Sequence, residues 1–155
     1  MTQRSGEGSK RARPNGSERQ RGRDAVSSGT AAKPLHVLVV DDDRVDRIAL
    51  RRALQQTDFD VTVGEADGVI AAIDLLTAEP FDCVLLDYDL PDGDGLTFLR
   101  GLRGAGISAT VVMITGQPDN AVATELMEAG AADYIPKALF TPALLSQTLQ
   151  RLFGT

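Results

Sequence analysis

Cysteine and histidine are almost absent from this chain, which has one of each among its 155 residues. A single cysteine excludes a disulfide framework within the chain and suits a reducing compartment. Cys83 lies inside an apolar run, so we expect a small buried core residue rather than a redox thiol. His36 could be read as a phosphoryl carrier or a metal ligand. Its place at the start of a predicted strand favours a structural or solvent-facing role.

Long apolar runs are also missing from the sequence. No stretch of roughly 18 apolar residues occurs, so no membrane-spanning helix is predicted. The N-terminus lacks the apolar segment of a secretory signal. We therefore expect a cytoplasmic protein that makes no contact with a membrane.

Charge is distributed unevenly along the chain. Residues 1–34 hold eight of the 16 Lys and Arg residues but only three of the 22 Asp and Glu residues. The remainder carries eight basic and 19 acidic residues, a net charge of −11, which makes it a poor nucleic-acid binder. Because residues 1–34 contain almost no large apolar side chain, we predict a disordered basic tail there and one folded domain over 35–155. The tail could contact nucleic acid or an acidic partner, but its scattered charges favour a solvated extension.

From Pro34 onward, short apolar runs alternate with segments of helical periodicity. The runs predicted as strands are 36–40, 61–66, 83–86, 110–114 and 134–136. Five βα units in a row predict an α/β fold, a (βα)5 doubly wound, flavodoxin-like parallel five-stranded sheet of order 2-1-3-4-5. The helical segments carry end signals, a C-terminal cap at Gly130 and an N-cap at Thr141 followed by Pro142. In the first helix, one face is shared by Val45, Ile48, Ala49 and Ala53.

Residues that can bind a metal ion and a phosphoryl group follow four of these predicted strands. Asp41 and Asp42 end the first strand, Asp87 the third, Thr115 the fourth and Lys137 the fifth. In an open parallel sheet, the binding crevice lies outside the carboxyl ends of the strands, at the point where the strand order reverses. We therefore expect three carboxylates, a hydroxyl and an ammonium group to meet there.

The expected cluster of carboxylates needs a cation, because unpaired acids would raise one another's pKa and destabilise the fold. Mg²⁺ (or Mn²⁺) prefers such oxygen ligands, so Asp41 and Asp42 are candidate metal ligands, whereas Asp43 reads as a helix N-cap. Asp87 is the best nucleophile candidate, since a carboxylate can attack phosphorus and form an aspartyl phosphate. The metal, the Thr115 hydroxyl and the Lys137 ammonium could then each hold one phosphoryl oxygen.

Four segments, VLVVDDDRVDR, FDCVLLDYDLPDGDGL, VVMITGQ and GAADYIPK, resemble the receiver (CheY-like) domain of bacterial two-component response regulators. The resemblance covers residues 35–155, and the order, spacing and strand context of the motifs agree with it. It implies a phosphoacceptor at Asp87, which a sensor histidine kinase or a histidine phosphotransfer protein would phosphorylate. It implies a metal site whose ligands are Asp41, Asp42, Asp87 and the backbone carbonyl of Asp89.

The resemblance also implies a switch. Thr115 and Lys137 would bind the phosphoryl group, the rotamer of Tyr134 would follow the Thr115 hydroxyl, and Asp89 and Gln117 would tune the phosphoryl lifetime. Pro91 and Gly95 match the loop after the acceptor. A stand-alone receiver of this kind would switch its binding to a downstream effector protein in two-component signalling or a phosphorelay. We expect no enzyme activity beyond Mg-dependent self-phosphorylation and autodephosphorylation, no DNA-binding output domain in this chain, and the option of a homodimer.

One position departs from the family pattern. Receivers usually have Lys-Pro with a cis peptide after the fifth strand, whereas Ala138 follows Lys137 here. A cis peptide before alanine costs about 2.5–4 kcal/mol, so we predict a trans bond and an altered loop over residues 137–141.

Three alternatives differ from a stand-alone receiver. The chain could be a receiver fragment of a hybrid kinase, which nothing in the sequence excludes. It could be a haloacid-dehalogenase-type phosphatase, because Asp87-Tyr88-Asp89 matches the D-x-D motif of those enzymes, although the acidic pair here precedes the nucleophile. It could also be an interaction module independent of phosphorylation, against which the intact acceptor, Thr115 and Lys137 argue.

Overall fold

The computed structural model describes residues 33–116 and 119–154. The expected basic tail, residues 1–34, lies outside these ranges except for its last two residues. The strands of the main sheet are β2 (Leu35–Val40), β3 (Val61–Ala66), β4 (Cys83–Asp87), β7 (Thr110–Thr115) and β8 (Asp133–Pro136). The helices are α1 (Arg44–Gln55), α2 (Val69–Ala78), α3 (Gly95–Gly104), α4 (Asn120–Glu128) and α5 (Pro142–Phe153).

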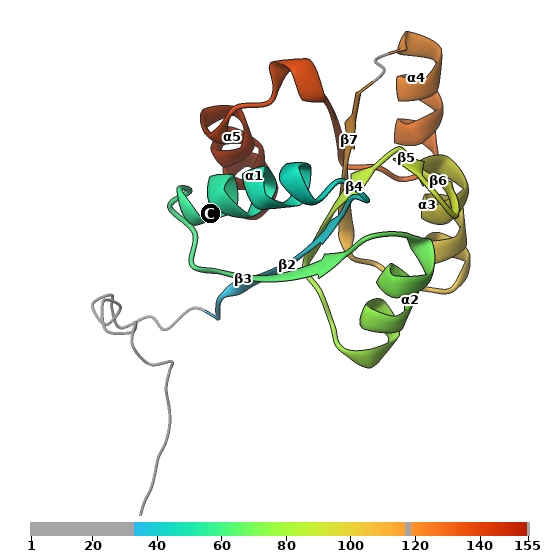
Figure 1. The fold of residues 1–155 in the computed structure, drawn as a ribbon, viewed down its shortest axis with the longest axis horizontal. Coiled ribbons are helices and arrows are strands. Elements are labelled where there is room, and N and C mark those ends of the chain that lie inside the picture. The colour runs from blue at the N-terminus through green and yellow to red at the C-terminus, as the bar shows by residue number, and fades with distance from the viewer. Residues whose placement is uncertain (1–32, 117–118, 155) are drawn as a thin grey trace, which may run out of the picture. The chain divides into compact units, whose positions relative to one another are not determined.

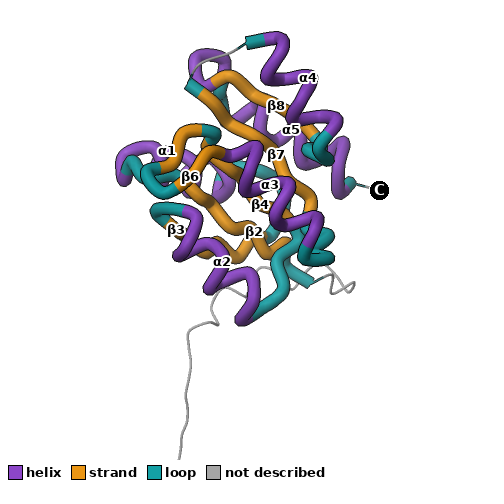
Figure 2. The backbone as a smooth tube through the Cα atoms, turned by 90° about the vertical axis from the view of Figure 1, so that its right-hand side faces the viewer, coloured by secondary structure: helices purple, strands orange, loops and turns teal. Residues whose placement is uncertain are grey.

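The five strands form one parallel sheet in the order β3-β2-β4-β7-β8 (Figure 1). Counted along the chain, this is the predicted flavodoxin-like order 2-1-3-4-5, and the prediction of fold class is confirmed. The strand order reverses between β2 and β4, so the carboxyl ends of these two strands flank the switch point. The tube view shows α2 and α3 side by side over one face of the sheet (Figure 2).

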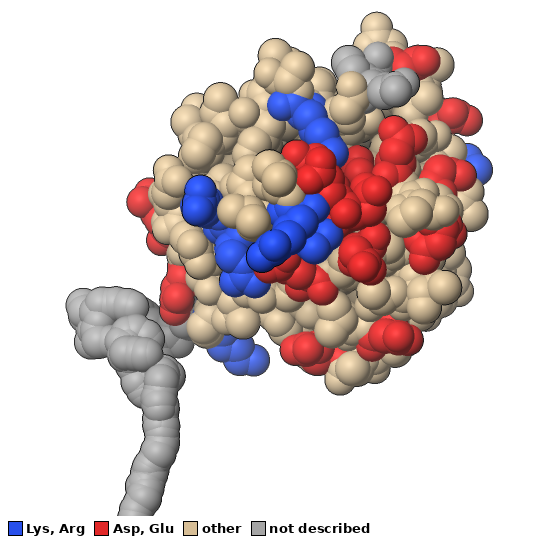
Figure 3. Space-filling model, viewed as in Figure 1, with Lys and Arg blue, Asp and Glu red and all other residues tan. Residues whose placement is uncertain are grey.

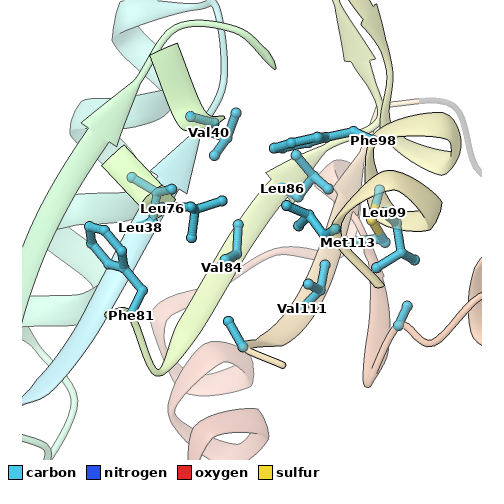
Figure 4. Packing of buried hydrophobic residues seen from close by; sticks show 14 of the residues in the cluster. Leu38, Val40, Leu76, Phe81, Val84, Leu86, Phe98, Leu99, Val111 and Met113 are labelled. Carbon is cyan, nitrogen blue, oxygen red and sulfur yellow. The ribbon is translucent and has the colours of Figure 1, made fainter. Parts of the chain in front are cut away.

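An apolar core lies on each face of the sheet, where the sheet packs against its helices, because successive strand side chains point to opposite faces. On one side, Leu38 and Val40 pack with residues of α2, α3 and α4 (Figure 4). On the other side, Val37 and Val39 pack with residues of α1 and α5. Both faces are therefore covered, which is why the strands read as continuous apolar runs rather than alternating ones. Cys83 is fully buried in the second core, as expected.

The buried face of α1 differs from the face that the sequence pattern indicated. Of the predicted face, Ala53 is buried, but Val45 and Ile48 are 71% and 38% exposed, and the other buried contacts come from Leu50 and Leu54. Periodicity alone could not decide between the two sets, since both follow helical spacing. Packing against α5 and the sheet selects the set that contains two leucines.

The predicted helix ends and the role of the single histidine are confirmed. The Asp43 carboxylate caps α1 and accepts hydrogen bonds from two backbone N–H groups of its first turn, and Thr141 Oγ1 accepts one from Leu144 N at 3.0 Å. Gly130, just past α4, has a φ of +110°, a conformation that favours glycine. His36 bonds the Pro80 carbonyl through Nδ1 at 2.8 Å and stacks on Phe81, which is a structural role.

The loop after the acceptor strand contains a short hairpin that was not predicted. Strands β5 (Asp89–Leu90) and β6 (Gly93–Asp94) pair in antiparallel fashion, and Gly95 N then donates to the Tyr88 carbonyl at 2.7 Å. Two-residue strands are too short to leave a periodic signal. The hairpin turns the chain so tightly that α3 begins directly against the end of β4.

Gly95 makes this close approach feasible, and its replacement by alanine is expected to destabilise the domain. A Cβ at this position would lie 2.6 Å from Met113 Cε, 3.0 Å from Tyr88 Cα and 3.1 Å from the Asp87 carbonyl oxygen. Two of these atoms are backbone and cannot move aside cheaply. We expect Gly95→Ala to lower the free energy of unfolding by about 1–3 kcal/mol in urea denaturation. Gly101→Ala is the matched control, because a Cβ there meets no atom within 4 Å; equal stability of the two variants would contradict the account.

The turn after β8 has the predicted trans bond at Lys137–Ala138, since residues 33–116 and 119–154 contain no cis peptide. A 3-10 turn, η5 (Lys137–Leu139), follows β8 at once. It leaves the Leu139 side chain 64% exposed beside the carboxyl ends of the strands. The described helices include none long and apolar enough to cross a bilayer.

Candidate functional site

The carboxyl ends of β2, β4, β7 and β8 bring four of the predicted residues together. Asp87 ends β4 beside Ile114, Thr115 ends β7 beside Pro136, and Lys137 follows Pro136 directly. Asp41 follows β2, and β2 pairs with the edge of β4 that lies opposite β7. Asp41, Asp87 and Thr115 are buried, with exposed fractions of 1%, 5% and 2%. The parallel register, rather than any local motif, therefore places these side chains in one crevice.

Three carboxylates of the crevice can share one cation. One oxygen each of Asp41, Asp42 and Asp87 lies within 4.8 Å of the others. Asp41 Oδ1 accepts a hydrogen bond from Asp43 N at 2.8 Å. Asp41 Oδ2 is fully buried and receives no well-aligned hydrogen bond, although Lys137 Nζ lies 3.1 Å away. A buried carboxylate oxygen without such a bond is costly in an empty crevice and is suited to a metal ion.

Lys137 brings an ammonium group to the carboxylates of this crevice. Its Nζ lies 2.7 Å from Asp46 Oδ2, 3.1 Å from Asp41 Oδ2 and 3.6 Å from Asp87 Oδ1. The Asp46 contact was missed in the sequence, because Asp46 lies in the first turn of α1 rather than at a strand end. The available signal was its position: an acid in the first turn of a helix that starts at the crevice points back toward it.

The acids of the crevice are harder to ionise than free aspartates. Burial, followed by the charge of Asp41, raises the pKa of Asp87 to about 6. Burial also raises the pKa of Asp41, against the hydrogen bond from Asp43 N and the neighbouring Lys137 ammonium. Burial alone lowers the pKa of Lys137, but the hydrogen bond to Asp46 and the nearby carboxylates of Asp41 and Asp87 outweigh this effect, so the pKa of Lys137 is raised. A single ammonium thus does not neutralise the carboxylates around it.

Basic residues of α1 border the acidic crevice. Arg47 NH1 donates to the Asp41 carbonyl at 2.7 Å, and Arg47 Nε and Arg51 Nε donate to the Glu65 carboxylate at 3.1 and 2.9 Å. These bonds fasten the backbone of Asp41 to α1 and to the end of β3. The space-filling view shows the result as a stretch of Lys and Arg beside a gathering of Asp and Glu (Figure 3).

The remaining predicted site residues lie around the crevice in different settings. Asp89 is exposed and opens β5, two residues past Asp87. Tyr134 is half-buried on β8, and its hydroxyl accepts a hydrogen bond from Asp119 N at 3.1 Å, at the start of α4. Gln117 lies outside the described residues. The roles predicted for Asp89, Tyr134 and Gln117 stay predictions.

Stability should depend on pH through Asp87 in a defined direction. Because its pKa is raised to about 6 in the folded protein from 3.8, ionisation opposes folding. The stability that protonated Asp87 contributes is fully present below about pH 4 and is lost as the pH rises through about 6. Removing the carboxylate as Asp87→Asn should therefore stabilise the metal-free protein increasingly between pH 4 and 7. The unfolding temperatures of wild type and Asp87→Asn across this pH range measure the effect. A difference between the two unfolding temperatures that stays constant or shrinks as the pH rises would contradict the raised pKa.

An acidic crevice at the switch point of a five-stranded flavodoxin-like sheet defines the CheY-like class of α/β domains. The model of the response regulator receiver domain matches residues 37–150, and the chain belongs to this family. The folded part is thus a receiver domain of two-component response regulators, which confirms the resemblance read from the motifs.

Individual relatives agree with this assignment. The response regulator MprA of Mycobacterium sp. (strain KMS) is 37% identical over 114 residues, which cover 74% of this chain and 49% of MprA. The chain spans about half the length of the curated relatives that it matches. Among solved structures, the receiver domain of the putative response regulator NarL from Mycobacterium tuberculosis has a TM-score of 0.72 at 29% identity, covering 78% of this chain and 97% of that one. The BeF3-activated receiver domain of DrrB has a TM-score of 0.68 at 28% identity, covering 79% and 100%.

Proposed function

We propose that this receiver accepts a phosphoryl group on Asp87 and thereby switches its binding to a partner protein. The observation that carries the proposal is the setting of Asp87. Its buried carboxylate lies within 4.8 Å of the Asp41 and Asp42 oxygens and 3.6 Å from Lys137 Nζ. A nucleophilic oxygen, a cation-binding pair of acids and an ammonium group therefore share one crevice. A receiver domain is not a classical enzyme, and the chemistry proposed here is a single transfer to the protein itself.

In the transfer, an Asp87 carboxylate oxygen forms a bond to phosphorus while the phosphorus–nitrogen bond of a phosphohistidine donor breaks. The electron pair of the broken bond goes to the imidazole nitrogen of the donor. The Lys137 ammonium, already 3.6 Å from Asp87 Oδ1, donates to one phosphoryl oxygen, and the Thr115 hydroxyl donates to another. Such transfers depend mainly on positioning and charge neutralisation, which are what these residues supply.

The metal in this proposal is Mg²⁺, or Mn²⁺ in its place. Asp41, Asp42, Asp87 and the backbone carbonyl of Asp89 would hold it, and the Asp41 oxygen without an aligned hydrogen bond supports this ligand set. Bound there, the ion would neutralise the carboxylates and the charge on the phosphoryl oxygens. Its hard oxygen ligands argue for these two ions over softer metals.

The switch would pass from the phosphoryl group to the surface through Thr115 and Tyr134. Thr115 moves toward the new charge, and Tyr134 turns inward into the space that it leaves. In the present structure, the Tyr134 hydroxyl accepts from Asp119 N at 3.1 Å, so the inward rotamer would release the start of α4. Both states then differ at α4, β8 and α5, where a downstream effector would distinguish them.

The partners follow from this chemistry. The phosphodonor would be a sensor histidine kinase or a histidine phosphotransfer protein, and we expect both to act on this chain in the cytoplasm. Asp89, exposed beside the acceptor, would influence the phosphoryl lifetime. The match to the receiver family over residues 37–150 favours this proposal over a haloacid-dehalogenase-type phosphatase.

The proposal is tested by labelling with a small phosphodonor such as acetyl phosphate. We expect the purified chain to incorporate close to one phosphoryl group per molecule with Mg²⁺, and almost none after EDTA treatment. Mn²⁺ should restore incorporation. Label that is equal with and without divalent cations, or that is absent under both conditions, would overturn the proposal.

A further inference from the structure

Lys137 makes its shortest contact with a residue outside the predicted phosphoryl site. Its Nζ lies 2.7 Å from Asp46 Oδ2, which is closer than either Asp41 Oδ2 at 3.1 Å or Asp87 Oδ1 at 3.6 Å. The Asp46 contact is a hydrogen bond between side chains 91 positions apart in the chain. The ammonium therefore lies closer to the Asp46 carboxylate of α1 than to the acceptor carboxylate.

The three N–H donors of a lysine limit what Lys137 can bind at once. In the metal-free crevice, Asp41, Asp46 and Asp87 present three carboxylates to those donors. A metal on Asp41 and Asp87 would neutralise those two groups, so the contact that still holds the ammonium on the α1 side of the crevice would be the one with Asp46. Asp46 would remain, since its side chain is 37% exposed on α1 and is not among the three carboxylates that can share the ion.

We infer that Asp46 restrains Lys137 in the unphosphorylated protein and competes with the incoming phosphoryl group for its ammonium. Asp46 is therefore a positioning residue that slows phosphorylation of Asp87 and sets the threshold for activation. This inference rests on the proposed phosphorylation of Asp87. The negative charge of Asp46 acts in the same direction, because it adds to the acids that already oppose a phosphoryl anion.

The test compares labelling rates with limiting acetyl phosphate and saturating Mg²⁺. Asp46→Asn removes the charge with little change of shape, and Asp46→Ser is a second variant in case the first folds poorly. We expect both to be labelled roughly three- to fivefold faster than wild type, the range that a partly exposed ion pair supports. Asp74→Asn, an exposed acid on α2, is the matched control and should keep the wild-type rate.

A second comparison asks whether Asp46 acts through Lys137. In the Lys137→Ala background, adding Asp46→Asn should change the labelling rate less than twofold. Rates at or below wild type for both Asp46 variants would overturn the inference, and so would an equal acceleration with and without Lys137. If wild type itself takes up no label with Mg²⁺, the proposed function fails. If wild type takes up label and the Asp46 variants are labelled at the wild-type rate, the proposed function stands and only the restraint by Asp46 is rejected.

Discussion

Replacing Asp87 with asparagine is expected to abolish phosphorylation of this chain, lowering incorporation from a small phosphodonor by at least about 100-fold. The amide keeps the shape of the side chain but has no anionic oxygen to attack phosphorus. We do not expect its neighbours Asp41 and Asp42 to replace it, because in this proposal their carboxylates hold the metal ion. Incorporation is measured on a phosphate-affinity gel or by intact-protein mass spectrometry.

Loss of labelling must be separated from loss of folding. The metal-free Asp87→Asn protein should unfold at a higher temperature than wild type at pH 7, because the pKa of Asp87 is raised to about 6 mainly by burial. A variant that is more stable yet unlabelled has lost its nucleophile and nothing else. Asp74→Asn should label as wild type does. Labelling of Asp87→Asn at more than a tenth of the wild-type rate would contradict the assignment of the acceptor.

The second large effect is expected at Asp41, the buried acid of the metal site. Asp41→Asn should weaken Mg²⁺ binding by at least roughly 10- to 100-fold. Mutating a residue that only hydrogen-bonds to a metal ligand already costs that much affinity, and Asp41 is proposed to be a ligand itself. The reason is its Oδ2, which is fully buried and receives no aligned hydrogen bond, so the ion is the group that best satisfies it. Isothermal titration calorimetry with MgCl₂ measures the affinity directly.

Asp43→Asn is the matched control for Asp41→Asn. Asp43 lies two residues along the chain and caps α1, a position where asparagine serves about as well as aspartate. We expect this variant to bind Mg²⁺ within twofold of wild type. Equal affinities of the Asp41 and Asp43 variants would show that the buried carboxylate is not a metal ligand.

Strand and helix positions were predictable where local patterns and tertiary packing agree. The range of β3 was predicted to the residue, and the other four strands of the sheet were predicted to within one residue at one end. The buried face of α1 was not fully predicted. The face with Val45 and the face with Leu50 both follow helical spacing and differ only in which parts of the fold pack against them. The hairpin β5–β6 was also missed, because strands of two residues carry no periodicity.

The candidate site was predictable to the extent that strand ends converge. Asp41, Asp87, Thr115 and Lys137 come together through the parallel register alone. Asp46 was out of reach, because its contact with Lys137 depends on where α1 begins relative to the crevice and on the reach of two side chains. The trans Lys137–Ala138 bond, in contrast, followed from the residue type.

The central claim is that Asp87 is the residue that becomes phosphorylated. Reductive trapping with sodium borohydride tests it most directly, because it converts an aspartyl phosphate to homoserine at the modified position. Peptide mass spectrometry of the trapped protein should find homoserine at position 87 after treatment with acetyl phosphate and Mg²⁺, and aspartate there when Mg²⁺ is omitted. Homoserine at Asp41, Asp42 or Asp89, or unmodified Asp87 in a protein that carries label, would contradict the account.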